Sequence, residues 1–483
     1  MKLSTGARHS ISYTLIGALP FLSALVLLPF YSNQLSTADF GLLNVYISLA
    51  LLAQVITTLG VDQYIPVLIS TTISDPERRK TLLSHAFGFQ LVYGILATVV
   101  LCFLGSALMQ WMYGSEASSF WPYGVLSIIT GFFNGYFRTQ TTVFSFEERV
   151  RIYGGFNLFN FVLTIVLSLW FLNLYGPTIM GPIMGRLISG VAIFILSVVY
   201  QMKHSTPRAV GEGLKEVTTI SMVMFFYSLV MWVLNYVDRF VITANCSLED
   251  VAVYDFYMKC LSPLEFLQMG LSGFLLPRMY TSFSGNYERP EMSRANTLLH
   301  GFTVASVISL LGVMLVIPII GPWFIRNEAL FASFDLMGLV GIGFLTKTLF
   351  LPYMGVLMLR KEAGRVVRAL TISAAIQVVA LGAFTGPWGI LGAVVAILIG
   401  KVFSVLLLRL EMGNRIVLRI NLYKTVVYPL IISLLLVGLY ILRETITLLG
   451  GVSIALGISI LISWFFFRKD LGKAKEVIFG KSA

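Results

Sequence analysis

The sequence is poor in charge, cysteine and histidine. Only 12% of its 483 residues are charged, 57% are hydrophobic, and there are 3 cysteines and 4 histidines. Soluble domains carry about 25% charged residues, so this composition excludes a soluble globular protein. The cysteines, Cys102, Cys246 and Cys260, show no C-x-x-C spacing and no companion histidine cluster. That pattern argues against a metal site or a redox pair. It favours the interpretation that the three cysteines serve as small apolar residues within helices.

The sequence also lacks the motifs of common enzyme classes. It contains no G-x-x-x-x-G-K-S/T nucleotide loop, no H-E-x-x-H and no G-x-S-x-G. All expected loops are short, which leaves no room for a soluble catalytic domain. We therefore expect a non-enzyme without a cofactor. Any transport would be driven by a proton or sodium gradient, by the membrane potential or by the substrate's own gradient.

What the chain has in abundance is long apolar runs. Runs of about 20 residues recur along the whole sequence, and each is long enough to cross a bilayer as a helix. They are too continuous for the alternating pattern of barrel strands. We predict an all-α, polytopic membrane protein with about fourteen transmembrane helices. The expected spans are 11–31, 41–69, 82–109, 123–144, 154–173, 180–200, 218–243, 252–276, 298–320, 334–359, 366–385, 389–408, 425–442 and 446–467.

The basic residues predict the orientation. If the N-terminus lies in the cytoplasm, most of the 34 lysines and arginines fall on the cytoplasmic side, and the bias alternates at every loop. Both termini are therefore expected in the cytoplasm. The net charge of +11 then reflects topology and contact with anionic lipid headgroups, and no nucleic-acid partner is expected.

The chain contains an internal repeat. When Thr37–Pro66 is moved forward by 211 positions without a gap, Asp39 falls on Asp250 and Tyr46 on Tyr257. Six spans separate equivalent positions, so both halves insert in the same direction and form two parallel lobes. Such lobes enclose a central space, which is the natural substrate path. The predicted parts are a six-helix lobe over 1–217, a second over 218–424, and two further helices with a basic tail over 425–483.

Charged residues inside the spans are the candidate functional residues. A charge at the bilayer centre costs about 2.5–3.5 kcal/mol on insertion scales, so each needs a partner, a wet cavity or an interfacial position. The candidate substrate-binding cations are Arg186, Arg239, Lys259, Lys347 and Lys401. The candidate ion-coupling or charge-pair acids are Asp238, Asp255 and Glu265.

Each position allows a structural and a functional interpretation. Asp255 and Lys259 lie four residues apart, which fits either a self-neutralising pair or a wet cavity wall. Arg186 either faces a cavity or reaches the outer headgroups.

The other charged positions are interpreted from their depth in the span and their spacing. Lys347 lies too deep to reach the headgroups, and Lys401 fits either interpretation. Asp238 and Arg239 are adjacent on a helix and are not expected to pair; Asp238 would point inward and Arg239 to the interface. Because the cations exceed the acids, an anionic ligand such as phosphate is expected.

The order of several segments resembles a known family. These segments are LSTADFGLLNVYISLALLAQ near the start, YGPTIMGPIMGRLIS near the end of the first half, and NYVDRFVITANCSLEDVAVYDFYMKC near the start of the second. Together they resemble the O-antigen and capsular polysaccharide repeat-unit flippases. These form the polysaccharide transporter branch of the multidrug/oligosaccharidyl-lipid/polysaccharide (MOP) exporter superfamily.

The resemblance implies a function. It implies a flippase that uses alternating access to move a polyprenyl diphosphate-linked oligosaccharide across the bacterial cytoplasmic (inner) membrane, with Arg186, Arg239, Lys259 and Lys347 as substrate contacts. It also implies a monomer that works with a polysaccharide polymerase and a chain-length regulator. Two alternatives stay open: a multidrug or cell-wall lipid-precursor exporter of the same superfamily, and a membrane polysaccharide polymerase.

Overall fold

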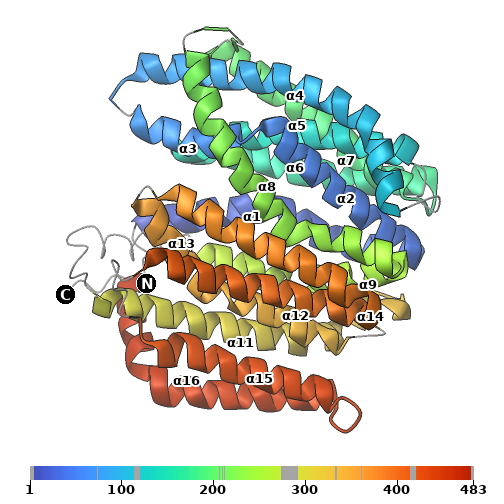
Figure 1. Cartoon of the computed structure of the whole chain (residues 1–483), viewed down its shortest axis with the longest axis vertical. Coiled ribbons are helices and arrows are strands. Elements are labelled where there is room, and N and C mark those ends of the chain that lie inside the picture. The colour runs from blue at the N-terminus through green and yellow to red at the C-terminus, as the bar shows by residue number, and fades with distance from the viewer. Residues whose placement is uncertain are drawn as a thin grey trace. The chain divides into compact units, whose positions relative to one another are not determined.

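The computed structural model describes residues 5–72, 74–113, 120–205, 207–208, 210–211, 213–272, 292–331, 334–360, 362–413 and 420–479. Within these ranges every regular element is a helix (Figure 1). Ten of the described helices are long and apolar enough to cross a membrane, and one of them is 50 residues long and contains two of the predicted spans. Each of the fourteen predicted spans coincides with helical structure over its described residues, and only 273–276 of the span predicted at 252–276 lie outside them. The predicted fold class is confirmed.

The helices of the first half are eight in number along the described chain. They are α1 (Thr5–Gln34), α2 (Thr37–Thr58), α3 (Val61–Thr71), α4 (Pro76–Tyr113), α5 (Phe120–Phe146), α6 (Val150–Tyr175), α7 (Met180–His204) and α8 (Gly213–Asn245).

The second half begins with α9 (Leu248–Cys260) and a helical stretch over residues 262–272. The elements that follow are α11 (Met292–Phe324), η2 (Glu328–Phe331), α12 (Leu336–Leu345), α13 (Lys347–Leu359), α14 (Ala363–Met412), η3 (Tyr423–Val427, a π-helix), α15 (Tyr428–Ile441) and α16 (Leu448–Phe479).

The chain divides into two compact units. The N-terminal unit is Leu19–Ala252, and the C-terminal unit is Val253–Ala483 together with Met1–Ala18. The last two helices thus belong to the same unit as α11 to α14. The lobe boundaries predicted at 217/218 and 424/425 stay predictions.

Glycines break two of the predicted spans. Span two consists of α2 and α3, which are separated by Leu59 and Gly60 in the left-handed region, with φ of 43° and 73°. Glycine adopts such a conformation without a steric penalty. In α14 the helix is broken at Gly389, with φ 58° and ψ −139°. The chain therefore turns one residue after the predicted Gly386-Pro387-Trp388 turn, as two consecutive spans require.

The internal repeat is visible in the helix starts. Ser36 Oγ donates to Asp39 Oδ2 over 2.7 Å and accepts from the Asp39 backbone N–H over 3.0 Å. At the equivalent positions Ser247 Oγ donates to Asp250 Oδ2 over 2.8 Å and accepts from the Asp250 N–H over 3.1 Å. Both helices therefore begin with the same reciprocal cap, which satisfies backbone donors that would otherwise lack partners.

Asp250 also affects the neighbouring thiol. Burial and the negative charge of Asp250 both raise the pKa of the Cys246 thiol. A raised pKa leaves less thiolate at a given pH, and the thiolate is the reactive form. In a chain with Cys102→Ser and Cys260→Ser, we expect slow maleimide labelling of Cys246 near neutral pH and a steep increase only above pH ~8.5, the ordinary thiol pKa.

The control for this prediction is Asp250→Asn, which removes the charge but keeps the size of the side chain. It should shift the labelling profile to lower pH. An unchanged profile would contradict the electrostatic part of the shift. A membrane-impermeant maleimide used on intact cells would also test whether this helix connection lies outside, as the orientation predicts.

A charged cluster joins the last two helices to α11 within the C-terminal unit. α11 packs against α16, and α15 against α16, so the three lie side by side (Figure 1). Asp470 Oδ2 accepts from Lys424 Nζ at 2.7 Å and lies 2.8 Å from Nδ1 of His300. Lys424 belongs to η3, which directly precedes α15, and His300 belongs to α11. The Asp470 carboxylate therefore connects α16 to both of these elements.

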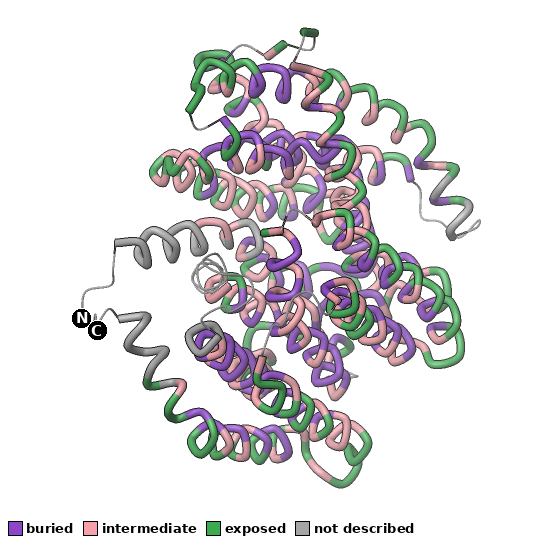
Figure 2. The backbone as a smooth tube through the Cα atoms, turned by 60° about the vertical axis from the view of Figure 1, so that its left-hand side comes forward, coloured by how far each residue is buried: buried purple, intermediate pink, exposed green. Residues whose placement is uncertain are grey.

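The outward faces of the helices are apolar. Along α4, the side chains of Leu96 and Phe103 are exposed by 61% and 74%. Figure 2 shows exposed and buried residues alternating along the helices, with one face of a helix packed and another open. Large exposed apolar faces of this kind are rare in soluble proteins and match a lipid environment. The chain is a multi-pass membrane protein.

Candidate functional site

The N-terminal unit contains a small cavity of about 40 Å³ between α2, α5 and α7. Its lining is unusual for a transmembrane bundle because more than half of the residues are polar: Tyr46, Gln54, Ser127, Thr130, Asn134 and Arg186. The remaining lining residues are aliphatic, and the lining contains no acidic residue among the described positions. The cavity therefore carries a net positive charge and contains several polar side chains.

Close packing positions Arg186 in this wall. A Cβ added at Gly185 would lie 2.4 Å from Cα of Ser168, and one at Gly181 would lie 2.7 Å from Cα of Leu172. The two glycines therefore let α7 lie directly on the α6 backbone, as small residues do between membrane helices. Arg186 follows Gly185 and projects from this fixed helix into the cavity lining.

The guanidinium of Arg186 lacks a counter-ion. It makes no ion pair with any residue that the structure describes, and its Nε atom is buried without a hydrogen-bond partner in that part of the chain. The hydroxyl of Tyr31 lies close to it but in a geometry that makes no hydrogen bond. An uncompensated cation in an apolar bundle is costly, which marks the position as a functional candidate.

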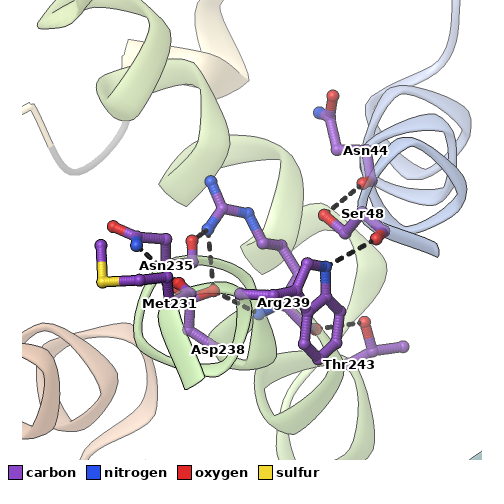
Figure 3. A network of polar contacts seen from close by, with 8 residues as sticks. Asn44, Ser48, Met231, Asn235, Asp238, Arg239 and Thr243 are labelled. Atoms are coloured by element: carbon purple, nitrogen blue, oxygen red, sulfur yellow. Dashed lines mark hydrogen bonds and ion pairs between the residues drawn. The ribbon is translucent and has the colours of Figure 1, made fainter. Parts of the chain in front are cut away.

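Arg239 and Asp238 form a buried ion pair on α8, which corrects our prediction (Figure 3). Nη1 of Arg239 lies 2.8 Å from Asp238 Oδ1 and 2.5 Å from the carbonyl oxygen of Asn235, and the two charged side chains are only 6% and 2% exposed. Adjacent Cβ atoms do point apart, but the arginine side chain is long enough to fold back along its own helix. Arg239 is therefore buried and does not reach the interface.

The same part of α8 is fixed to α2. The indole N–H of Trp232 donates to the carbonyl oxygen of Ser48 over 3.1 Å. Arg239 additionally lies over the ring of Tyr236, with its Cζ atom 5.2 Å from the ring centroid. This segment of α8 is thus held by the contacts of the Arg239 guanidinium and by the hydrogen bond of Trp232 to α2.

In the C-terminal unit, Lys259 and Asp255 form the predicted pair along α9. The Nζ to Oδ2 distance is 3.0 Å, and the side chains are 16% and 9% exposed. The spacing of four residues places both groups on one helix face. The pair is neutral as a unit, which agrees with the structural interpretation; whether it also faces a wet cavity stays a prediction.

Two further lysines meet on one aromatic ring. Nζ of Lys347 lies 5.2 Å and Nζ of Lys401 lies 5.0 Å from the ring centroid of Phe344. Ammonium groups are attracted to the face of an aromatic ring at such distances. Lys347 is also paired with Glu265, with 2.6 Å between Nζ and Oε1. We call Lys347, Lys401, Glu265 and Phe344 the lysine cluster.

Local backbone features hold the lysine cluster in place. Lys347 begins α13 because the helix is interrupted at Thr346, whose hydroxyl donates to the Gly343 carbonyl over 2.8 Å. The backbone carbonyl of Phe344, at the end of α12, accepts a hydrogen bond of 2.9 Å from the Gln268 amide. The cluster therefore combines the 262–272 stretch with α12, α13 and α14.

The two sites bring cationic and polar side chains together, and neither is a metal centre in the described chain. Among the described residues, no group of three or more His, Cys, Asp or Glu side chains is placed to hold a metal ion. The first site offers one forked guanidinium with amides and hydroxyls. The second offers two ammonium groups and one carboxylate on an aromatic ring.

Several of these residues were not predicted from the sequence. The polar lining of the cavity was missed, although Tyr46, Ala50 and Gln54 follow each other at intervals of four along α2. Ser127, Thr130 and Asn134 likewise share one face of α5. Polar positions at helical spacing inside apolar spans were the signal that could have found them.

Comparisons with known proteins agree with this architecture. A family model described as "Polysaccharide biosynthesis protein" matches residues 7–283, which is more than half of the chain. No curated protein matches the chain.

Solved structures share the fold. The lipid II flippase MurJ in an inward closed conformation matches with a TM-score of 0.70 and 15% identity, over 95% of this chain and 99% of that one. A multidrug resistance MATE family transporter of the MOP superfamily, in an inward-facing conformation, matches with a TM-score of 0.56 and 13% identity, over 86% and 95%. A MOP superfamily transporter from Pyrococcus furiosus, described as having a binding pocket of reverse polarity, matches with a TM-score of 0.56 and 14% identity, over 86% and 99%.

Proposed function

The chain belongs to the polysaccharide biosynthesis protein family, and on this premise we propose that it is a flippase for a lipid-linked glycan. The cargo is a polyprenyl diphosphate-linked oligosaccharide repeat unit. It moves by alternating access from the cytoplasmic to the outer leaflet of the bacterial cytoplasmic membrane, where it is used for a surface polysaccharide such as O-antigen or capsule.

The observation that carries this proposal is the charge of the two sites. Arg186 has no ion pair with any described residue, and two ammonium groups of the lysine cluster lie on the ring of Phe344. Positive charge of this kind attracts an anionic cargo and repels organic cations, which disfavours a drug exporter for such cations. Arg239 and Lys259 are paired with carboxylates of their own helices. Of the other cations, Arg186 lines the cavity, and Lys347 and Lys401 share the ring of Phe344, so these three are the proposed contacts for the cargo.

Further parts of the proposal concern energy and surroundings. The sequence has no nucleotide-binding motif, so an ion gradient or the membrane potential drives transport, with Asp238, Asp255 and Glu265 as candidate coupling residues. Both termini face the cytoplasm. The flippase works as a monomer and passes its cargo to a polymerase and a chain-length regulator.

The direct test is to delete the gene in its host and determine on which leaflet single lipid-linked repeat units accumulate. The proposal predicts loss of surface polysaccharide, accumulation on the cytoplasmic face, and rescue by the full-length gene. Units stranded on the outer face would instead indicate a polymerase. Unchanged polysaccharide with new drug sensitivity would indicate a drug exporter, and arrested cell-wall synthesis would indicate a cell-wall precursor exporter.

A further inference from the structure

We propose that the cavity around Arg186 binds the carboxylate of an acidic sugar within the transported glycan. This inference rests on the proposed function, because it names a chemical feature of the cargo. It assigns the cavity to a uronic acid type of sugar and leaves the diphosphate to other cations.

Charge balance is the first argument. Arg186 is the one charged residue in the lining that the structure describes, so the cavity neutralises a single negative charge. A guanidinium presents a planar fork that matches the two oxygens of a carboxylate. A diphosphate carries more than one negative charge, and the surplus would remain uncompensated in this apolar bundle.

The size of the cavity is the second argument. One water position needs about 10–15 Å³, so a cavity of about 40 Å³ holds roughly three atoms of that size. A carboxylate has three non-hydrogen atoms and fits. A diphosphate has several times as many and would have to extend beyond this volume.

The remaining lining supplies partners for a sugar. The side chains of Gln54, Ser127 and Asn134 line the cavity and add two amides and a hydroxyl to it. The hydroxyl of Thr130 donates to the Leu126 carbonyl over 2.7 Å, so its oxygen is left to accept a bond. Amide and hydroxyl groups next to a guanidinium can bind both the carboxylate and the neighbouring sugar hydroxyls.

The cavity walls are rigid. A Cβ at Gly131 would lie 2.3 Å from the Ala50 carbonyl oxygen, so α5 lies directly against α2 at the cavity. On the other side, Gly185 fixes α7 against α6. Walls held by backbone contact keep the polar groups in position before the ligand arrives, which reduces the cost of ordering them on binding.

Binding to the purified full-length protein is the first test. We would measure the thermal unfolding temperature with glucuronate, glucose and inorganic pyrophosphate. Glucuronate should raise it, glucose should raise it much less, and Arg186→Gln should abolish the glucuronate effect. Arg186→Lys should retain part of it because the charge remains without the fork. The control Lys203→Gln removes an exposed charge from the same helix and should behave like the wild type.

Two results would overturn the inference: a glucuronate effect that persists in Arg186→Gln, or a stronger Arg186-dependent effect of pyrophosphate. Asn134→Asp serves as a second variant, since it is nearly isosteric and places a carboxylate in the same cavity lining. It should weaken the glucuronate effect without removing the arginine. If it left the effect unchanged while preserving the fold, the ligand would not occupy this cavity.

Transport separates this inference from the proposed function. Proteoliposomes would receive two fluorescent polyprenyl diphosphate disaccharides that differ only in a terminal glucuronic acid or glucose. The wild type should move the acidic form at least ~10-fold faster, a difference of about 1.4 kcal/mol, and Arg186→Gln should remove that preference. Equal rates in the wild type would overturn the inference and leave the flippase function standing. If neither compound moved, the flippase function would fail, and the binding experiment alone would decide the inference.

Discussion

Alanine at Gly41 should prevent the protein from accumulating in a folded form. A Cβ at this position of α2 would lie 1.8 Å from the carbonyl oxygen of Leu248 and 2.8 Å from its carbonyl carbon. The obstructing atoms are backbone atoms in the first turn of α9, which no change of rotamer can move. Overpacked core substitutions cost about 1–3 kcal/mol when side chains can adjust, so we expect at least the upper end of that range here.

The matched control is Gly155→Ala on α6, in the same unit. No atom lies within 4 Å of a Cβ at that position. Because alanine is the better helix former, the control should be neutral or more stable by about 0.5–1 kcal/mol. Size-exclusion profiles of detergent extracts and thermal unfolding would compare the two variants. Equal behaviour would show that α2 and α9 are not in backbone contact.

The internal repeat explains why glycine occurs at this place. Gly41 corresponds to Ala252 in the second repeat, and a Cβ at Gly41 would also lie 3.2 Å from the backbone nitrogen of Ala252. Equivalent positions of the two repeats therefore pack against each other. Where two equivalent helix starts meet this closely, at least one of them must lack a side chain, and the first repeat supplies the glycine.

The fold was predictable because its determinants are local. Span length and hydropathy fix the number of membrane helices, since a bilayer leaves backbone groups no partners except those within the helix. The repeat was visible for a similar reason. Asp39 and Asp250 cap their helices through residues three positions away, so the same short pattern recurs in sequence and in structure.

The site was less predictable because its contacts join distant parts of the chain or depend on side-chain length. Lys347 and Lys401 were predicted separately as cavity cations, but nothing local indicates that both lie on Phe344. The Arg239–Asp238 pair was missed because the spacing rule describes Cβ directions, whereas the long arginine side chain reaches back to the Asn235 carbonyl.

The second large effect should come from the lysine cluster. Lys347→Gln combined with Lys401→Gln should lower polysaccharide export by at least ~10-fold, because about 1.4 kcal/mol of lost attraction to the anionic cargo already corresponds to that factor. Each single variant should have a smaller effect, since one ammonium group would remain on Phe344. Surface polysaccharide would be quantified in the deletion strain at matched protein levels. Lys469→Gln, an exposed position on α16, is the control.

The role of Glu265 can be separated from that of the lysines. Lys347→Gln alone leaves Glu265 without the ammonium group that lies 2.6 Å from it. Loss of export through misfolding should then lower the amount of folded protein and be relieved by adding Glu265→Gln, which removes the carboxylate left without that lysine, whereas loss of cargo attraction should leave the amount of folded protein unchanged.

Lys259→Gln provides the comparison within the same unit. Asp255 on the same helix already balances the charge of Lys259, so its loss removes little attraction for an anion and should reduce export less than the double lysine variant does. If the double lysine variant exported at the wild-type level, the positive charge of this cluster would not act on the cargo. The Arg186 cavity would then be the main anion site, and the diphosphate would have to be bound elsewhere.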